Sequence, residues 1–294
     1  MSGSNASANA SAEAPAKRAG WRDVLRSLRQ RKVAAMLMLG FASGLPLYLV
    51  GNTMGYWMRD GGSDLSAIGF LSWVGLAYTL KFVWAPLIDK TRVPLLGRLG
   101  HLRGWILLSQ IVVAAGLIGM ATIQPEGSLT VFGVMALIAA FASATQDIVI
   151  DAWRIEISDN GEELGLLSAS SQLGYRAALL VTDALILILA ANIGWAPSYW
   201  VMALLMGVGM VAVFLAREPV RKSAPADAAS GEAASASAPI LWTARGLFDA
   251  IVGPFVAFFK VHGKFALLML LAISLYRMPD FVLGPMANPF YKDL

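Results

Sequence analysis

Long apolar stretches make up most of this chain, and short polar segments separate them. Six such stretches lie between residues 33 and 216, and a seventh runs from about 265 to 290. A helix needs about 20 mostly apolar residues to cross a bilayer, and helices satisfy their own backbone polar groups there. The pattern predicts an all-α, multi-pass membrane protein. We expect the first six spans at 33–57, 66–88, 104–123, 129–152, 165–191 and 197–216.

The segments outside the spans differ in composition. Residues 1–32 start as an Ala/Ser/Asn-rich run and end in a basic stretch, which predicts a disordered N-terminal tail. Residues 217–264 hold an Ala/Ser-rich linker, followed by apolar residues at helical spacing with charges between them. That spacing predicts an amphipathic helix on the membrane surface. The organisation is therefore a tail, a six-helix bundle (33–216), a cytoplasmic connection and a seventh span within 265–294.

Composition and charge agree with this class. Hydrophobic residues make up 57% of the chain and charged residues 14%, against about 25% charged in soluble domains. Seven basic residues lie in 1–32 and four in 89–103, whereas three short connections on the other side hold only Arg59. This asymmetry predicts a cytoplasmic N-terminus. It also accounts for the net charge of +4, so we expect a lipid environment and no nucleic-acid partner.

Motifs of soluble enzymes are missing from the sequence. There is no cysteine, which excludes disulfides, thiolate metal sites and thiol nucleophiles. The two histidines, His101 and His262, lie far apart, and neither a Gly-rich phosphate loop nor an HExxH pattern occurs. We therefore expect neither an enzyme nor a cofactor or metal site.

A weak internal repeat relates the first span to the seventh. At an offset of 233 residues, like residues align in five pairs: Pro46/Pro279, Gly51/Gly284, Trp57/Phe290, Arg59/Lys292 and Asp60/Asp293. Transporters built from two related six-helix halves show such repeats. The pattern predicts a fragment of, or a truncation within, a transporter of about twelve helices.

Charged residues inside the spans are the main candidates for function, because each costs about 2.5–3.5 kcal/mol on insertion scales. Asp147 and Asp151 share one face of span 4, where two carboxylates repel each other unless a cation lies close. Such a pair is the chemistry that a proton-coupled carrier needs. We expect Asp147 and Arg176, the latter near mid-membrane, to line a transport path. Asp151 either acts with Asp147 or forms a structural ion pair with Arg154.

Polar and aromatic residues of the other spans leave alternatives open. Tyr48 and Asn52 lie one turn apart in span 1 and could hydrogen-bond either a polar ligand or a neighbouring helix. Asp183 is expected near the outer surface with a structural role. Tyr56 and Trp57 are expected in an interfacial aromatic belt rather than in a binding platform.

Six stretches together resemble the AmpG family of muropeptide permeases, within the major facilitator superfamily. They are GFASGLPLYLVG (40–51), VGLAYTLKFVWAPLIDK (74–90), HLRGWILLSQ (101–110), ATQDIVIDAWRIE (144–156), LGYRAALLV (173–181) and RMPDFVLGPMANPFYKDL (277–294). The resemblance covers the chain from about residue 33 to its last residue, apart from the linker.

The resemblance implies proton-driven import of N-acetylglucosamine–anhydro-N-acetylmuramyl peptides across the bacterial inner membrane, for cell-wall recycling. Spans 1, 4 and 7 would line the central cavity. The implied substrate contacts come from Asn52, Gln146, Asp147 and Arg277, with Tyr48 beside them. Arg176 or Arg277 suits the carboxylates of the peptide stem.

The resemblance also implies a gating loop, and it leaves other functions open. Asp89 and Lys90, followed by Arg98, look like a stretched form of the superfamily's cytoplasmic loop signature, and the insertion departs from that pattern. The alternatives are a carrier for another large anion, such as acyl-CoA, and a truncated membrane protein that regulates and does not transport.

Overall fold

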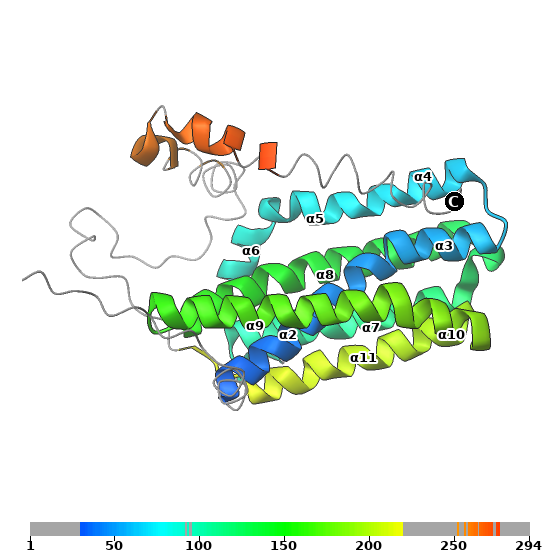
Figure 1. The fold of residues 1–294 in the computed structure, drawn as a ribbon, viewed down its shortest axis with the longest axis horizontal. Helices are drawn as coiled ribbons and strands as arrows, with labels where there is room; N and C mark the ends of the chain where they lie inside the picture. Colours follow the sequence, from blue (N-terminus) through cyan, green and yellow to red (C-terminus); the bar gives the residue numbers. More distant parts are fainter. Residues whose placement is uncertain are drawn as a thin grey trace, which may run out of the picture. The chain divides into compact units, whose positions relative to one another are not determined.

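The structure is a computed structural model. It describes residues 30–91, 93 and 96–219, together with 252, 256, 258–263, 265–272 and 275–276. The regular secondary structure in this part of the chain is entirely helical (Figure 1). The predicted all-α class is therefore confirmed.

The chain divides into two compact units. The first unit comprises 1–75 and 93–220, and the second comprises 76–92 and 221–294. The predicted tail up to residue 29 and the Ala/Ser linker lie outside the described residues. The predicted seventh span is described only at 265–272 and 275–276, where the chain is helical.

Long helices form the first unit. They are α2 (Arg31–Leu49), α3 (Asn52–Asp60), α4 (Leu65–Leu71), α7 (His101–Gly127), α8 (Leu129–Ile157), α9 (Gly161–Leu180), α10 (Ile186–Ile193) and α11 (Trp195–Leu215). Two 3₁₀ segments, η1 (Ser72–Gly75) and η3 (Leu96–Leu99), and a π segment, η4 (Val181–Leu185), complete this unit. Among the residues that the structure describes, six segments are long and apolar enough to cross a membrane, and each overlaps a predicted span.

Span 2, expected as one helix over 66–88, is divided into short segments. α4 and η1 belong to the first unit, whereas α5 (Leu76–Leu80), η2 (Lys81–Val83) and α6 (Ala85–Lys90) belong to the second. Pro86 lies in the first turn of α6. Because proline has no N–H to bond the preceding turn, α6 begins there instead of continuing η2.

Helix α2 lies at the centre of the first unit and contacts α8, α9 and α11 (Figure 1). It approaches α9 most closely, at positions where both helices carry small residues. A Cβ added to Gly40 would clash with the carbonyl oxygen of Ser171, and one added to Gly174 would clash with that of Leu37. Gly40 and Gly44 form a GxxxG pattern, which lets two membrane helices pack backbone to backbone. The contact between spans 1 and 5 therefore depends on glycine on both helices.

Replacing Gly174 with leucine is expected to separate α2 from α9. The side chain would meet the backbone of Leu37, which cannot rotate away, so the free energy of unfolding should fall by about 3 kcal/mol, the upper end for overpacking. Thermal unfolding in detergent measures this loss. Gly165→Leu is the matched control on α9, because nothing lies within 4 Å of an added Cβ there. An equal loss in both variants would contradict the role of the close contact.

An aromatic cluster joins three helices at the end of the first unit that holds Asp60. Trp57 stacks on Trp195 with ring centroids 6.2 Å apart, and Tyr199 lies 4.7 Å from it. The ring of Phe132 meets Trp57 edge-on at 5.2 Å. Trp57 is thus buried, and the prediction that it belongs to an interfacial belt is wrong. Its helix faces the neighbouring spans at this position, so the indole fills the core instead.

Candidate functional site

Asp147 of α8 is the first candidate in the first unit. Its side chain is half-buried, and the hydroxyl of Ser43 on α2 donates a hydrogen bond of 2.5 Å to Oδ1. A short hydrogen bond to a carboxylate inside a span offsets part of the cost of placing it there. The carboxylate is therefore fixed at the contact of spans 1 and 4.

Asp151, one turn further along α8, has a different partner. Arg154 Nη2 lies 2.9 Å from Asp151 Oδ1, and the aspartate side chain is 52% exposed. This is the structural ion pair that we considered as one of its two roles. Because the cation of Arg154 lies close to Asp151, it reduces the repulsion between the carboxylates of Asp151 and Asp147.

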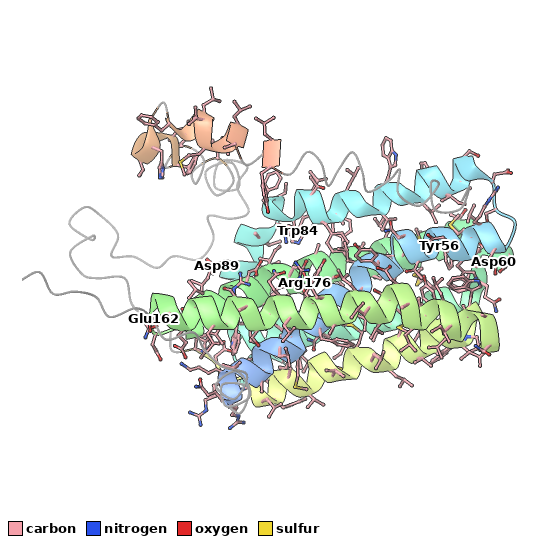
Figure 2. All side chains as sticks on the ribbon, in the orientation of Figure 1. Tyr56, Asp60, Trp84, Asp89, Glu162 and Arg176 are labelled. Carbon is pink, nitrogen blue, oxygen red and sulfur yellow. The ribbon has the colours of Figure 1, made fainter. Side chains whose placement is uncertain are left out.

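Arg176 lies partway along α9, and its side chain is exposed on the first unit (Figure 2). Gln172 and Asp183 are exposed too, four residues before Arg176 and seven after it, at helical spacing, with Asp183 in the π segment η4. Glu162 lies at the start of α9 (Figure 2). The adjacent stripe of α9 is apolar, with Leu166, Leu173 and Leu180 exposed. One helix therefore presents an apolar side suited to lipid and a polar side suited to water.

Spans 1 and 5 both leave the α-helical conformation close to this stripe. Span 1 breaks at Val50 and Gly51, and span 5 contains the π segment η4. The freed carbonyls are bonded by buried side chains: Tyr199 donates to Leu49 O at 2.7 Å, and Thr53 donates to Thr182 O at 3.1 Å. Non-helical backbone is stable at membrane depth only when its polar groups are paired in this way. Such interruptions mark functional positions in many membrane proteins.

Three polar side chains flank these two interruptions. Tyr48 is half-buried one turn before the break, and Asn52 is exposed at the start of α3. Asp183, also exposed, lies within electrostatic range of the Tyr48 phenol. The structural role that we expect for Asp183 stays a prediction, and its position near Tyr48 makes it a further candidate for ligand binding. Its spacing of seven residues from Arg176 was the sequence signal for a shared stripe.

Side chains close the end of the first unit that holds Lys32. Lys32 Nζ lies 2.9 Å from Glu163 Oε1 and 3.0 Å from Asp159 Oδ2, which joins α2 to the turn between α8 and α9. Arg103 and Arg31 donate to the last carbonyls of α11, and Trp153 Nε1 donates to Arg217 O at 2.9 Å. The orphan carbonyls of this helix end are thereby satisfied.

A carboxylate caps the neighbouring helix at the same end. Glu218 accepts hydrogen bonds from the backbone N–H of Leu102 at 2.9 Å and of Arg103 at 3.2 Å, at the start of α7. Negative charge at a helix N-terminus is favourable. Gly100 precedes this helix with φ 117°, where a Cβ would clash with Glu218. The chain leaving α11 is therefore anchored to the start of span 3.

Comparison with known proteins shows which family this chain is related to. No protein-family model matches the chain. It is 39% identical to the anhydromuropeptide permease of Escherichia coli strain K12 over an alignment of 257 residues. The alignment covers 87% of this chain and 48% of that protein. Over 273 residues it is 31% identical to a Rickettsia conorii protein named as transporter AmpG 4, which covers 92% of this chain and 62% of that protein. The chain belongs to the AmpG family of the major facilitator superfamily.

The chain spans about half the length of the E. coli relative and less than two thirds of the Rickettsia one. The AmpG family resemblance is thus confirmed over the six spans, which also makes the protein a multi-pass membrane protein.

The remaining AmpG-family site predictions fall in separate places. Gln146 is fully buried in the first unit, away from the exposed stripe of α9, and its role in substrate binding stays a prediction. Arg277 lies outside the described residues. Asp89 is exposed near the end of α6 in the second unit, whereas the side chains of Lys90 and Arg98 lie outside the described part of the chain. A gating role for these three also stays a prediction.

Proposed function

We propose that this protein belongs to a proton-coupled permease that imports anhydromuropeptides across the bacterial inner membrane for cell-wall recycling. The similarity to a protein named anhydromuropeptide permease, over 87% of this chain, supports the substrate class. The positive-inside pattern supports an orientation with the N-terminus and the Lys32 end in the cytoplasm.

The observation that carries the proposal is the polar stripe of α9, with an exposed arginine partway along a span. A charge facing hydrocarbon is costly, so Arg176 and Gln172 are best accounted for by a water-filled path. A guanidinium there binds the carboxylates of a peptide stem in bidentate geometry. Tyr48, Asn52 and Asp183 offer hydroxyl, amide and carboxylate groups to the sugars, and Arg277 would add a second cation.

Asp147 is the proposed proton carrier. It is a carboxylate within a span, and its hydrogen-bond donor Ser43 lies on the helix that packs against α9. Protonation and deprotonation would change that contact, which links the charge of α8 to the position of span 1. Asp151 has the lesser part, because its charge is already paired with Arg154.

Uptake by intact cells tests the proposal. Cells that produce the protein at its native length are expected to accumulate radiolabelled N-acetylglucosamine–anhydro-N-acetylmuramyl peptide, and cells with the gene deleted are not. Dissipating the proton gradient should stop accumulation. Gene-dependent uptake of radiolabelled acyl-CoA, without uptake of labelled muropeptide, would instead indicate a carrier for another large anion. No gene-dependent uptake of either compound would favour a regulatory protein.

A further inference from the structure

Three polar side chains in the core of the first unit have no hydrogen-bond partner among the described residues. They are Gln110 of α7 and Ser143 and Gln146 of α8. Each is fully buried, at 0% exposure, and for both glutamines the amide nitrogen and the amide oxygen lack a partner. Buried amides are almost always bonded, either to protein groups or to ordered water. Five buried polar atoms without a hydrogen bond in one bundle require an explanation.

The two glutamines lie at the same level of the bundle. α7 and α8 run antiparallel from the turn at Ser128, with Gly119 against Met135 and Gly116 against Ala139. Continuing this register toward the Lys32 end of the unit brings Gln110 level with Gln146. The polar groups therefore form a layer across the bundle and are not scattered along it.

Two further helices enclose this layer, and small residues let them approach it closely. A Cβ added to Gly209 of α11 would lie 2.6 Å from Gln110 Nε2 and would clash with Ala42 of α2. The Gln110 amide thus reaches the point where α7, α11 and α2 meet. A larger residue at Gly209 would displace this amide or Ala42. Glycine thus allows α11 to pack directly against the amide of Gln110.

The layer continues to the carboxylate of Asp147. Ser143 and Asp147 are one turn apart on α8 and share a face, and Gln146 is next to Asp147 in the chain. Ser43, which donates to Asp147, follows Ala42 on α2. The buried amides and the carboxylate are therefore parts of one polar region that crosses from α7 to α2.

We propose that this region, the Gln110–Gln146 layer, binds one or more internal water molecules, which bridge the two amides and Ser143 and extend the hydrogen bonds of Asp147 into the core. A water molecule donates and accepts, so it satisfies both ends of an amide that the surrounding protein groups leave without a hydrogen bond. The site does not depend on which molecule the protein transports.

A double-mutant cycle with Gln110→Met and Gln146→Met tests this proposal on the native-length protein in detergent. Methionine matches glutamine in length and flexibility and forms no comparable hydrogen bonds. Each single variant should lower the Tm, because it removes one partner of the shared water. The double variant should lose clearly less than both single losses added together. Additive losses, or a higher Tm in each single variant, would overturn the proposal. Gln110→Met with Gln172→Met, on the exposed stripe, is the additive control.

Radiolytic labelling in ¹⁸O water identifies the bridging molecule. Met206 is fully buried on α11, one turn from Gly209, and bound water should label it with ¹⁸O during a millisecond X-ray pulse. The label should be lost in the Gln110→Met/Gln146→Met variant, and Met54, buried elsewhere, should stay unlabelled in both proteins. An unlabelled Met206 in the natural protein would overturn the water site. A coupling between the glutamines that disappears when choline replaces sodium would also overturn the water site, because the molecule bridging them would then be a sodium ion.

Discussion

Asp147→Asn is expected to abolish proton-driven uptake. Asparagine keeps the shape of the side chain and can still accept from Ser43, whose hydroxyl bonds Oδ1 at 2.5 Å, but it cannot carry a proton. The rate of accumulation should fall by about 100-fold, the lower end for loss of a positioned proton-transfer group. The remaining uptake should no longer depend on external pH. Initial uptake rates between about pH 5.5 and about pH 8, in cells with equal amounts of protein in the membrane, measure both effects.

Two controls separate the carboxylate from its surroundings. Ser43→Ala removes the hydrogen bond and keeps the titratable group, so uptake should decrease and remain pH-dependent. Asp151→Asn removes a carboxylate from the same helix, one that is already paired with Arg154. Exposed ion pairs contribute about 1 kcal/mol or less, so uptake should change by less than about fivefold. If uptake by the Asp147→Asn variant is unchanged and still depends on pH, this residue has no part in the proposed mechanism.

Arg176→Gln is expected to reduce uptake of muropeptides that carry a peptide stem much more than uptake of the bare disaccharide. Glutamine keeps hydrogen-bonding capacity and loses the charge. Charge-assisted hydrogen bonds contribute about 1.5–3 kcal/mol, so kcat/KM for the peptide-bearing substrate should fall by about 10- to 100-fold. Arg176→Lys should recover only part of the loss, because an ammonium group cannot bind a carboxylate in bidentate geometry.

Arg59→Gln is the matched control, since Arg59 is exposed at the far end of α3 and belongs to no proposed binding group. It should leave the ratio of the two uptake rates unchanged. If Arg176→Gln lowers uptake of both substrates equally, the arginine maintains the bundle or the water-filled path and does not bind the stem. A full-sized loss in Arg59→Gln would point instead to the total charge of the protein.

Much of the fold could be predicted from the sequence, because a bilayer imposes simple requirements on a chain. A span needs about 20 apolar residues, and these stretches recur six times before the linker. Charges inside spans are expensive, so Asp147 and Arg176 were recognisable as candidates from composition alone. The ion pair of Asp151 with Arg154 also follows from local spacing, since the two residues are three apart on one helix.

Other features depend on how each helix is rotated about its axis and on what lies opposite. Trp57 fills an aromatic cluster instead of an interfacial belt, because α3 turns it toward Trp195 and Tyr199. Gln146 is adjacent to Asp147 in the chain, yet it faces the core and is fully buried. Hydropathy assigns a residue to a span, but it does not tell which neighbouring helix the side chain meets.

The sequence by itself determined the membrane class, six spans, the family and the charged residues that a bilayer tolerates only for a reason. Only the tertiary structure decided which of these residues meet. It places Ser43 against Asp147, pairs the broken backbone of span 1 with Tyr199 and brings Gln110 into a buried polar layer. Contacts between helices far apart in the chain arise from packing at glycines such as Gly40 and Gly174. The local sequence around a glycine does not indicate which helix packs against it.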